Sequence, residues 1–243
     1  MVSQAIQHIE SLLRARKLDG TLARPELVPA TASTGIAALD DALGGGWRRG
    51  ELSELTGPVS SGRTSVLVAT LAAATGRGEV VGLIDSIDRF DPASAAAAGL
   101  DVTRMLWVRG PSLSIMSERS AVRSQSDAAD TVVRRSLRAA DLIVRAGGFG
   151  VIALDLADVP LTAVRRVPAS SWLRLAHANE GRDTVCLLLG DTPMARSPRG
   201  WSVRVTAKAR WTGTTAQRRR LDGLDVQASI TSARDIATAQ VRL

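Results

Sequence analysis

Residues 57–65 read Gly-Pro-Val-Ser-Ser-Gly-Arg-Thr-Ser, and this short segment constrains the fold more than any other part of the chain. It fits the phosphate-binding pattern G-x-x-x-x-G-K-[ST] at Gly57, Gly62 and Thr64. In that pattern the glycines let backbone N–H groups close around phosphates, the hydroxyl holds Mg²⁺, and a lysine reaches the β- and γ-phosphates. Arg63 stands at the lysine position with a wider, planar fork. We therefore expect a phosphate-type loop with altered chemistry.

The segments on either side of the loop support this interpretation. Glu51–Thr56 alternates like a strand, and Ser65–Thr75 is an apolar, alanine-rich run that predicts a buried helix closed by Gly76. Strand, glycine loop and helix follow in the order that the chemistry needs, because the helix N-terminus supplies part of an anion site. Without this context, the match could equally be an ordinary glycine-rich turn.

Further strands are predicted along the chain, at Val80–Asp85, Met105–Arg109 and Thr184–Gly190. Another one, Gly150–Asp155, ends in an acidic residue after four apolar ones, which is the form of a Walker B segment. In that interpretation Asp155 holds Mg²⁺ through water. The alternative is a buried strand that merely stops at a polar residue.

Taken together, the order and spacing of these segments resemble the RecA recombinase family over roughly residues 30–243. The resemblance implies an α/β fold with a RecA-like P-loop core, in which helices cover both faces of a twisted, mostly parallel sheet. Alternation of Val203, Val205 and Ala207 with polar residues adds a C-terminal antiparallel extension. The segments that carry the resemblance are Ser33–Gly45, Gly50–Ser65, Leu83–Pro92 with Gly99–Asp101, and Gly148–Asp155.

Two more positions depart from the chemistry that this family implies. RecA-like enzymes carry a water-orienting glutamate two residues after the aspartate of the second strand, where this chain has Ile87. They also carry a γ-phosphate-sensing glutamine where this chain has Asp191, whose carboxylate would repel a triphosphate. With Arg63, these changes argue against ATP hydrolysis. We expect no catalytic residue, no firmly bound ATP–Mg²⁺, and a vestigial site made of Gly57, Gly62, Arg63, Thr64, Ser65 and Asp155.

The composition excludes several classes of function. The 243-residue chain has one cysteine and two histidines, so neither an internal disulfide nor a histidine-based metal site is expected. It contains neither a secretory signal nor an apolar run of the ~18–20 residues that a membrane span needs. We therefore expect a cytoplasmic protein without membrane contact.

The chain divides into an N-terminal helix (residues 1–18), a proline-containing linker (19–32) and the RecA-like core (33–243). Ile6, Ile9 and Leu13 form an apolar stripe at helical spacing. This stripe either packs on the protein's own core or docks on a partner. The family resemblance favours the second, because such helices dock on an adjacent RecA-type protomer, so self-association is also possible. Within the core, 111–129 is serine-rich and predicts a mobile insertion before a helix from about Asp130 to Ala146. The alternative is that this insertion contains a short helix of its own.

The net charge of +7 fits a nucleic-acid neighbourhood, although arginine codons are also common in GC-rich genes. The resemblance places a first DNA-contacting loop near Arg165 and Arg166, and a second one, here only about ten residues long, near Arg196 and Arg199. A loop this short predicts weak, non-specific DNA binding at most. The alternative for these arginines is an ordinary solvated turn.

The finer resemblance is to the ImuA-type accessory proteins of the bacterial damage-inducible mutasome. It rests on Leu106–Gly110 (LWVRG), the alanine-rich Pro92–Gly99, the Arg-Ala-Gly-Gly-Phe lead at 145–149, and the lack of a separate C-terminal domain. It implies a non-catalytic adaptor in SOS translesion synthesis. Its partners would be a Y-family polymerase-like protein, an error-prone replicative-type polymerase and a RecA-type recombinase. Two alternatives stay open: an ATP-binding RecA paralogue that acts as a recombination mediator, and a cell-division inhibitor of related fold.

Overall fold

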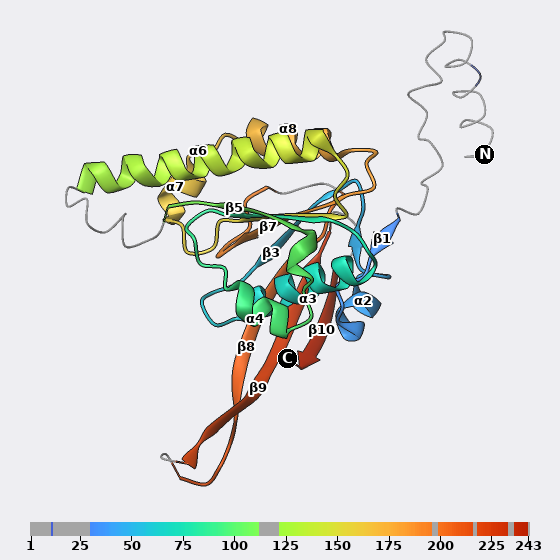
Figure 1. Ribbon diagram of the computed structural model, residues 1–243, viewed down its shortest axis with the longest axis vertical. Helices are drawn as coiled ribbons and strands as arrows, with labels where there is room; N and C mark the ends of the chain where they lie inside the picture. The colour runs from blue at the N-terminus through green and yellow to red at the C-terminus, as the bar shows by residue number, and fades with distance from the viewer. Residues whose placement is uncertain are drawn as a thin grey trace.

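A single eight-stranded sheet organises the chain in a computed structural model that describes residue 11 and residues 30–111, 122–195, 199–215, 218–232 and 236–242. The strand order is β10-β9-β8-β3-β7-β6-β4-β5 (Figure 1). This order confirms the predicted α/β class. The strands are β3 (Leu52–Thr56), β4 (Val81–Asp85), β5 (Met105–Arg109), β6 (Val151–Asp155), β7 (Val185–Gly190), β8 (Ser202–Thr212), β9 (Arg220–Thr231) and β10 (Ile236–Arg242).

Strands β3 to β7 pair in parallel, and β8 joins the outer side of β3 in the same direction. Strands β9 and β10 then continue the sheet as antiparallel partners, as the alternation near the C-terminus predicts. In the parallel part, Asp85 lies opposite Asp155, and Thr56 lies opposite Gly190. The carboxyl ends of these strands therefore bring the glycine loop and several aspartates to one edge of the sheet.

Helices cover both faces of the sheet, and each face has its own apolar core (Figure 1). Leu67, Leu71 and Val203 belong to the cluster on the α3 side. Val133, Trp172 and Leu188 belong to the cluster beneath α6, α7 and α8. Leu188 is fully enclosed, as expected for a parallel strand buried on both faces. The helices are α2 (Ala37–Ala42), α3 (Arg63–Gly76), α4 (Pro92–Ala97), α6 (Val122–Ala146), α7 (Leu161–Arg165) and α8 (Ala169–Asn179), with a 3₁₀ turn η2 at Val102–Arg104.

The structure extends the core further toward the N-terminus than the sequence predicts. Strand β1 (Thr31–Ala32) pairs antiparallel with β2 (Trp47–Arg48), so the last two residues of the predicted linker belong to the folded core. Ala32 and Trp47 are both buried, and this apolar contact explains why the segment is held in place. The predicted stripe of Ile6, Ile9 and Leu13 lies outside the described residues.

The predicted start of the long helix near Asp130 was wrong, because α6 begins at Val122. The extra turns are held by contacts that the serine-rich sequence does not reveal. Ala129 is buried in the core, and Arg166 binds both Ser126 (2.8 Å) and Asp130 (2.9 Å). Tertiary contacts of this kind override the low helix propensity of serine.

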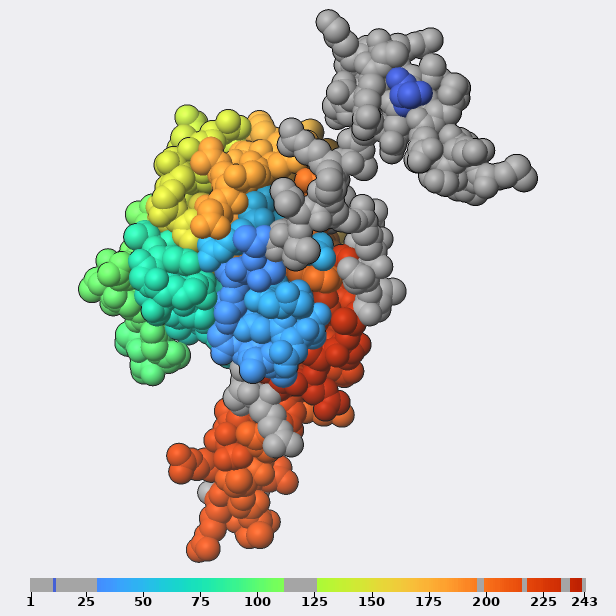
Figure 2. Space-filling model, turned by 90° about the vertical axis from the view of Figure 1, so that its right-hand side faces the viewer, coloured from blue at the N-terminus to red at the C-terminus, as the bar shows by residue number. Residues whose placement is uncertain are grey.

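Strands β8 and β9 continue beyond the sheet as a two-stranded ribbon, which projects from the body in both views (Figures 1 and 2). Val203 and Val205 are buried at its base, whereas Trp211 near its far end is 53% exposed. The apolar face predicted from the alternation is therefore buried only where the body of the protein covers it. None of the described helices is long and apolar enough to cross a membrane.

Candidate functional site

The glycine loop between β3 and α3 has the backbone shape that an anion-binding loop requires. Gly62 is the N-cap of α3 and has a φ of 85°, a conformation that strongly favours glycine. At Gly57 a Cβ atom would lie only 2.4 Å from the carbonyl oxygen of Val205, so a side chain there would clash with the sheet. Both glycines predicted for this loop are therefore required by its geometry.

Arg63 is the most unusual feature of the site because its side chain is buried and bound to the protein. It is 5% exposed. Its Nη1 donates to the carbonyl oxygen of Gly57 and to the carboxylate of Asp191, and its Nη2 donates to Asp158 at 2.8 Å. The guanidinium charge is thus neutralised by two carboxylates of the protein itself. Asp191, predicted as a repulsive replacement of the phosphate sensor, is held at the site by this ion pair.

Asp158 and Arg89 complete the network, and the sequence did not single out either of them. Asp158 has a φ of 62° and bridges the two arginines, accepting from Arg89 at 3.0 Å through its second oxygen. It follows the β6 strand by three residues. A buried arginine in place of the loop lysine needs nearby hydrogen-bond acceptors. Asp158 is the first carboxylate after the Walker B-like strand, and this position could have identified it from the sequence. We call these four residues the Arg63 network: Arg63, Asp158, Asp191 and Arg89.

The hydroxyl residues Thr64 and Ser65 of the loop take no part in this network. Both are exposed at the start of α3, and neither hydroxyl makes a hydrogen bond to the described part of the chain. Ser61 contrasts with them, since it is 2% exposed and its Oγ has no partner among the described residues. The loop therefore offers backbone N–H groups and hydroxyls to an anion, but Arg63, the cation within the loop, is already bound to carboxylates.

Asp155 and Asp85 end neighbouring strands and share the acidic side of the site. Asp85 accepts from the backbone N–H groups of Arg89 and Phe90, both at 2.9 Å. Burial raises the pKa of Asp155 to about 7, and the nearby Asp85 adds to the rise against a hydrogen bond from the Ala157 N–H (2.8 Å). Asp155 is therefore largely protonated in slightly acidic solution.

This shifted pKa predicts how stability depends on pH. Unfolded Asp155 ionises near pH 4, so between about pH 4 and 7 the folded state keeps a proton that the unfolded state has lost. Its contribution to the free energy of unfolding consequently falls as the pH rises through this range. Asp155→Asn keeps an acceptor for Ala157 and removes the titration. Converted in full into free energy, the pKa shift of Asp155 would correspond to about 4 kcal/mol. Because the side chain is partly exposed, we expect the free energy of unfolding of Asp155→Asn to exceed that of the wild type by about 2 kcal/mol at about pH 8.

Urea denaturation of the wild type and of Asp155→Asn at about pH 5 and pH 8 measures this effect. The difference in free energy of unfolding between the two proteins should be smaller at about pH 5, where wild-type Asp155 is protonated in the folded state. A stability difference that stays constant between the two pH values would contradict the assignment.

Ile87 occupies the position of the water-orienting glutamate and is part of the protein core. It is 3% exposed and packs in the cluster beneath α6. The nearest carboxylate, Asp88, has a φ of 57° and binds Arg109 through both oxygens, at 2.8 and 2.9 Å. Asp88 is thus held by the neighbouring strand, and hydrogen bonding to Arg109 lowers its pKa.

The arginines predicted to contact DNA are not brought together. Arg166 binds Asp130 near the start of α6, whereas Arg199 binds Glu180 at 3.2 Å and lies 3.9 Å from Glu51. Glu51 precedes β3, so Arg199 lies at the opposite end of the sheet from the glycine loop. Arg165 is exposed at the end of α7, and Arg196 lies outside the described residues. DNA contact by these arginines stays a prediction.

Comparison with known proteins agrees with the fold and the loop. A model of the RecA N-terminal domain matches residues 2–158, which is more than half of the chain. The chain belongs to the RecA family. The matched part of this RecA-family chain includes the glycine loop, Asp155 and Asp158, and it ends before Asp191 and the C-terminal strands.

Several curated RecA proteins are similar to parts of this RecA-family chain. Protein RecA of Picosynechococcus sp. is 33% identical over 153 residues, which are 63% of this chain and 42% of that protein. Protein RecA of Salinispora tropica is 34% identical over 133 residues, 54% of this chain and 32% of that protein. Protein RecA of Synechococcus sp. (strain CC9605) is 42% identical over 76 residues, which are 31% of this chain and 20% of that protein. The chain therefore spans less than half the length of these relatives.

The residues at the loop fit an anion better than they fit ATP with Mg²⁺. The backbone shape, the exposed hydroxyl of Thr64 and the unpartnered Oγ of Ser61 suit a phosphate group. A triphosphate, however, needs a free cation next to its terminal phosphates, and Arg63 is bound to Asp158 and Asp191. A phosphate placed there would also meet both carboxylates.

Proposed function

We propose that this chain is a non-catalytic RecA-like adaptor of damage-induced translesion DNA synthesis, of the ImuA type. The observation that carries the non-catalytic part is the binding of Arg63 to Gly57, Asp158 and Asp191. The cation that should stabilise the charge of a transferring phosphoryl group is neutralised by the protein's own carboxylates. Burial of Ile87 at the position of the water-orienting group supports the same proposal.

The partners of this adaptor are proposed from the sequence resemblance. They are a Y-family polymerase-like mutasome protein, an error-prone replicative-type polymerase and a RecA-type recombinase, with DNA bound weakly and without sequence preference. A RecA-type core without ATP turnover suits bridging, because protein surfaces rather than a reaction then carry the function. A role in DNA synthesis on the bacterial chromosome would place the protein in the cytoplasm. We also propose that the chain can self-associate through its N-terminal segment.

A second candidate function is an ATP-binding RecA paralogue that acts as a recombination mediator. The intact loop geometry favours it, since Gly62 keeps its left-handed conformation and Ser61 keeps an unused hydroxyl. In this alternative, Arg63 leaves its carboxylates when nucleotide arrives and binds phosphate instead. The two candidates differ in whether function needs the hydroxyl of Thr64.

Thr64→Ala separates these candidates. For an adaptor, we expect damage-induced mutation frequency in a deletion strain to be restored equally by the wild-type protein and by Thr64→Ala. Purified wild-type protein should release phosphate at least ~10³-fold more slowly than the RecA of the same organism, with or without single-stranded DNA, because electrostatic and general-base contributions are each worth orders of magnitude. Recombinase-like turnover that Thr64→Ala abolishes would instead establish the mediator.

A further inference from the structure

We propose that the groove between α6 and α8 docks an acidic, leucine-bearing segment of a different protein. The groove is open, encloses about 450 Å³, and is lined by Arg145, Ser170, Leu173, Arg174, His177 and Ala178. The two helices that form it cover the face of the sheet opposite to α3, whose first turn follows the glycine loop (Figure 1). As a partner site it rests on the proposed adaptor role, to which it adds the chemistry of the partner.

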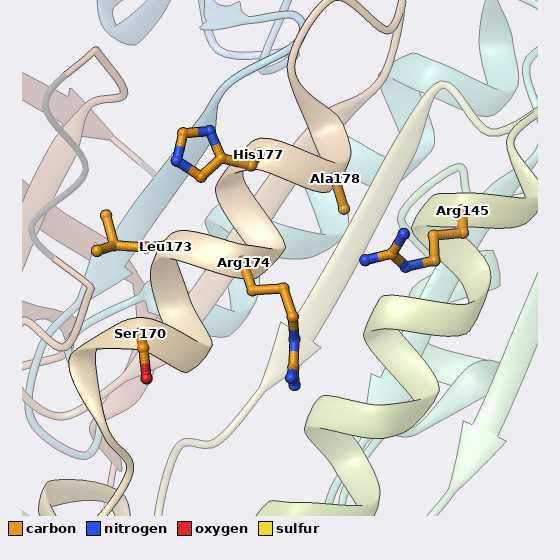
Figure 3. Close-up of a pocket in the computed structure, with 6 residues that line it drawn as sticks. All are labelled: Arg145, Ser170, Leu173, Arg174, His177 and Ala178. Carbon is orange, nitrogen blue, oxygen red and sulfur yellow. The ribbon is translucent and has the colours of Figure 1, made fainter.

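Two arginines give the groove its charge. Figure 3 shows Arg145 of α6 and Arg174 of α8 extending into the space between the two helices. Arg174 has no ion pair with the described part of the chain, and Arg145 pairs only with Asp141 of its own helix, at 3.0 Å. A carboxylate between the two guanidinium groups would form charge-assisted hydrogen bonds to both and reduce their mutual repulsion.

Leucines beside these arginines indicate a protein partner rather than a nucleic acid. Leu173 lines the pocket and is 47% exposed, and Figure 3 shows its side chain on the side of α8 that faces away from α6. Leu142 is 60% exposed and lies three residues before Arg145, which places it on the same side of α6. Exposed leucines offer nothing to a phosphate backbone, but they supply the apolar contacts that protein interfaces combine with arginine.

Charge decides whether the groove binds a segment of this chain, a second copy of the chain or a different protein. The N-terminal segment at 2–17 carries Glu10 against Arg14, Arg16 and Lys17, so it is itself basic. A second copy of the chain has a net charge of +7. Neither is complementary to a groove formed around two arginines. A segment rich in aspartate or glutamate, with leucines on the same face, is complementary in both charge and polarity.

A peptide experiment tests this proposal without any mutasome partner, so its failure would leave the adaptor role standing. The probe is a fluorescein-labelled helical peptide of about 15 residues with leucines and aspartates on one face. The matched peptide replaces each aspartate with asparagine. Fluorescence anisotropy should show binding of the acidic peptide that weakens at least ~10-fold in Arg174→Glu and in Arg145→Glu, because each reversal replaces attraction with repulsion. Leu173→Ser should weaken it by about 3- to 5-fold.

Arg134→Glu is the matched control, since it reverses a charge on α6 about 16 Å from Arg145 along the helix axis. It should change the affinity less than ~2-fold, and circular dichroism should show all variants folded because the changed side chains are exposed. Equal binding of the asparagine peptide, or an equal loss in Arg134→Glu, would overturn the proposal. So would an oligonucleotide whose binding depends on Arg145 and Arg174 while the acidic peptide does not bind.

Discussion

Replacing Arg63 with alanine is expected to lower the free energy of unfolding by about 3 kcal/mol. The substitution leaves Asp158 and Asp191 next to each other without the cation between them, and the carbonyl of Gly57 loses its donor. Asp158 keeps its bond to Arg89 at 3.0 Å, and Asp191 can turn toward water, which limits the loss. Urea denaturation near pH 7, followed by tryptophan fluorescence, measures the change.

Arg89→Ala is the matched control, because it removes only the outer arginine of the same network. Its side chain is 51% exposed, so we expect its free energy of unfolding to fall by less than about 1 kcal/mol.

Arg63→Lys keeps the charge without the planar fork, and its free energy of unfolding should fall by about 1–2 kcal/mol. If Arg63 keeps phosphate out by binding the two aspartates, Arg63→Lys should also bind Mg-ATP more tightly than the wild type. Equal stability of Arg63→Ala and Arg89→Ala would show that the network does not hold the loop.

Most of the sheet could be predicted from sequence because its strands are buried on both faces. Such strands appear as short apolar runs, and β6 and β7 were expected within one residue of their observed bounds. The C-terminal strands were found from alternation, which indicates the register of the side chains. Alternation does not indicate burial, so the exposure of Trp211 on the projecting ribbon could only come from the structure.

The candidate site was predicted less completely, because a motif identifies positions and not their partners. The pattern singled out Arg63 and the two glycines, and the family resemblance singled out Ile87 and Asp191. Nothing in the pattern indicated that Arg63 would be buried, since arginines are mostly exposed. Its partner Asp158 comes from a turn outside every motif, and the backbone places its carboxylate at the arginine through a φ of 62°.

Glu54 was also not identified from the sequence, because its hydrogen-bond partners lie far along the chain. It lies in the middle of the predicted strand before the loop, where a charged residue reads as the polar half of an alternation. In the structure it is 2% exposed, so its carboxylate must be paired within the protein. It accepts hydrogen bonds from the backbone N–H groups of Met194 (3.0 Å) and Ala195, and Ser202 Oγ lies 3.4 Å away. Glu54 therefore holds the segment after Asp191 against the sheet.

Glu54→Ala is expected to lower the free energy of unfolding by about 3 kcal/mol, because two part-buried N–H groups lose a carboxylate acceptor. Glu54→Gln keeps one acceptor oxygen and should lose about 1 kcal/mol. Ser202→Ala is the matched control, since it removes only the long contact at 3.4 Å and should have an effect below about 0.5 kcal/mol. Urea denaturation of the three variants measures these differences.

Hydrogen exchange distinguishes a local effect from a general loss of stability. In Glu54→Ala, the amides of Met194 and Ala195 should exchange at least ~10-fold faster than the change in global stability accounts for, because their acceptor is gone. Amides of β7, which precedes this segment, should follow the global change alone. A segment fixed to the core in this way cannot move freely to follow a DNA strand, so its position bears on the proposed adaptor role. Unchanged exchange at Met194 and Ala195 would mean that other contacts hold the segment, and a mobile DNA-contacting loop would regain support.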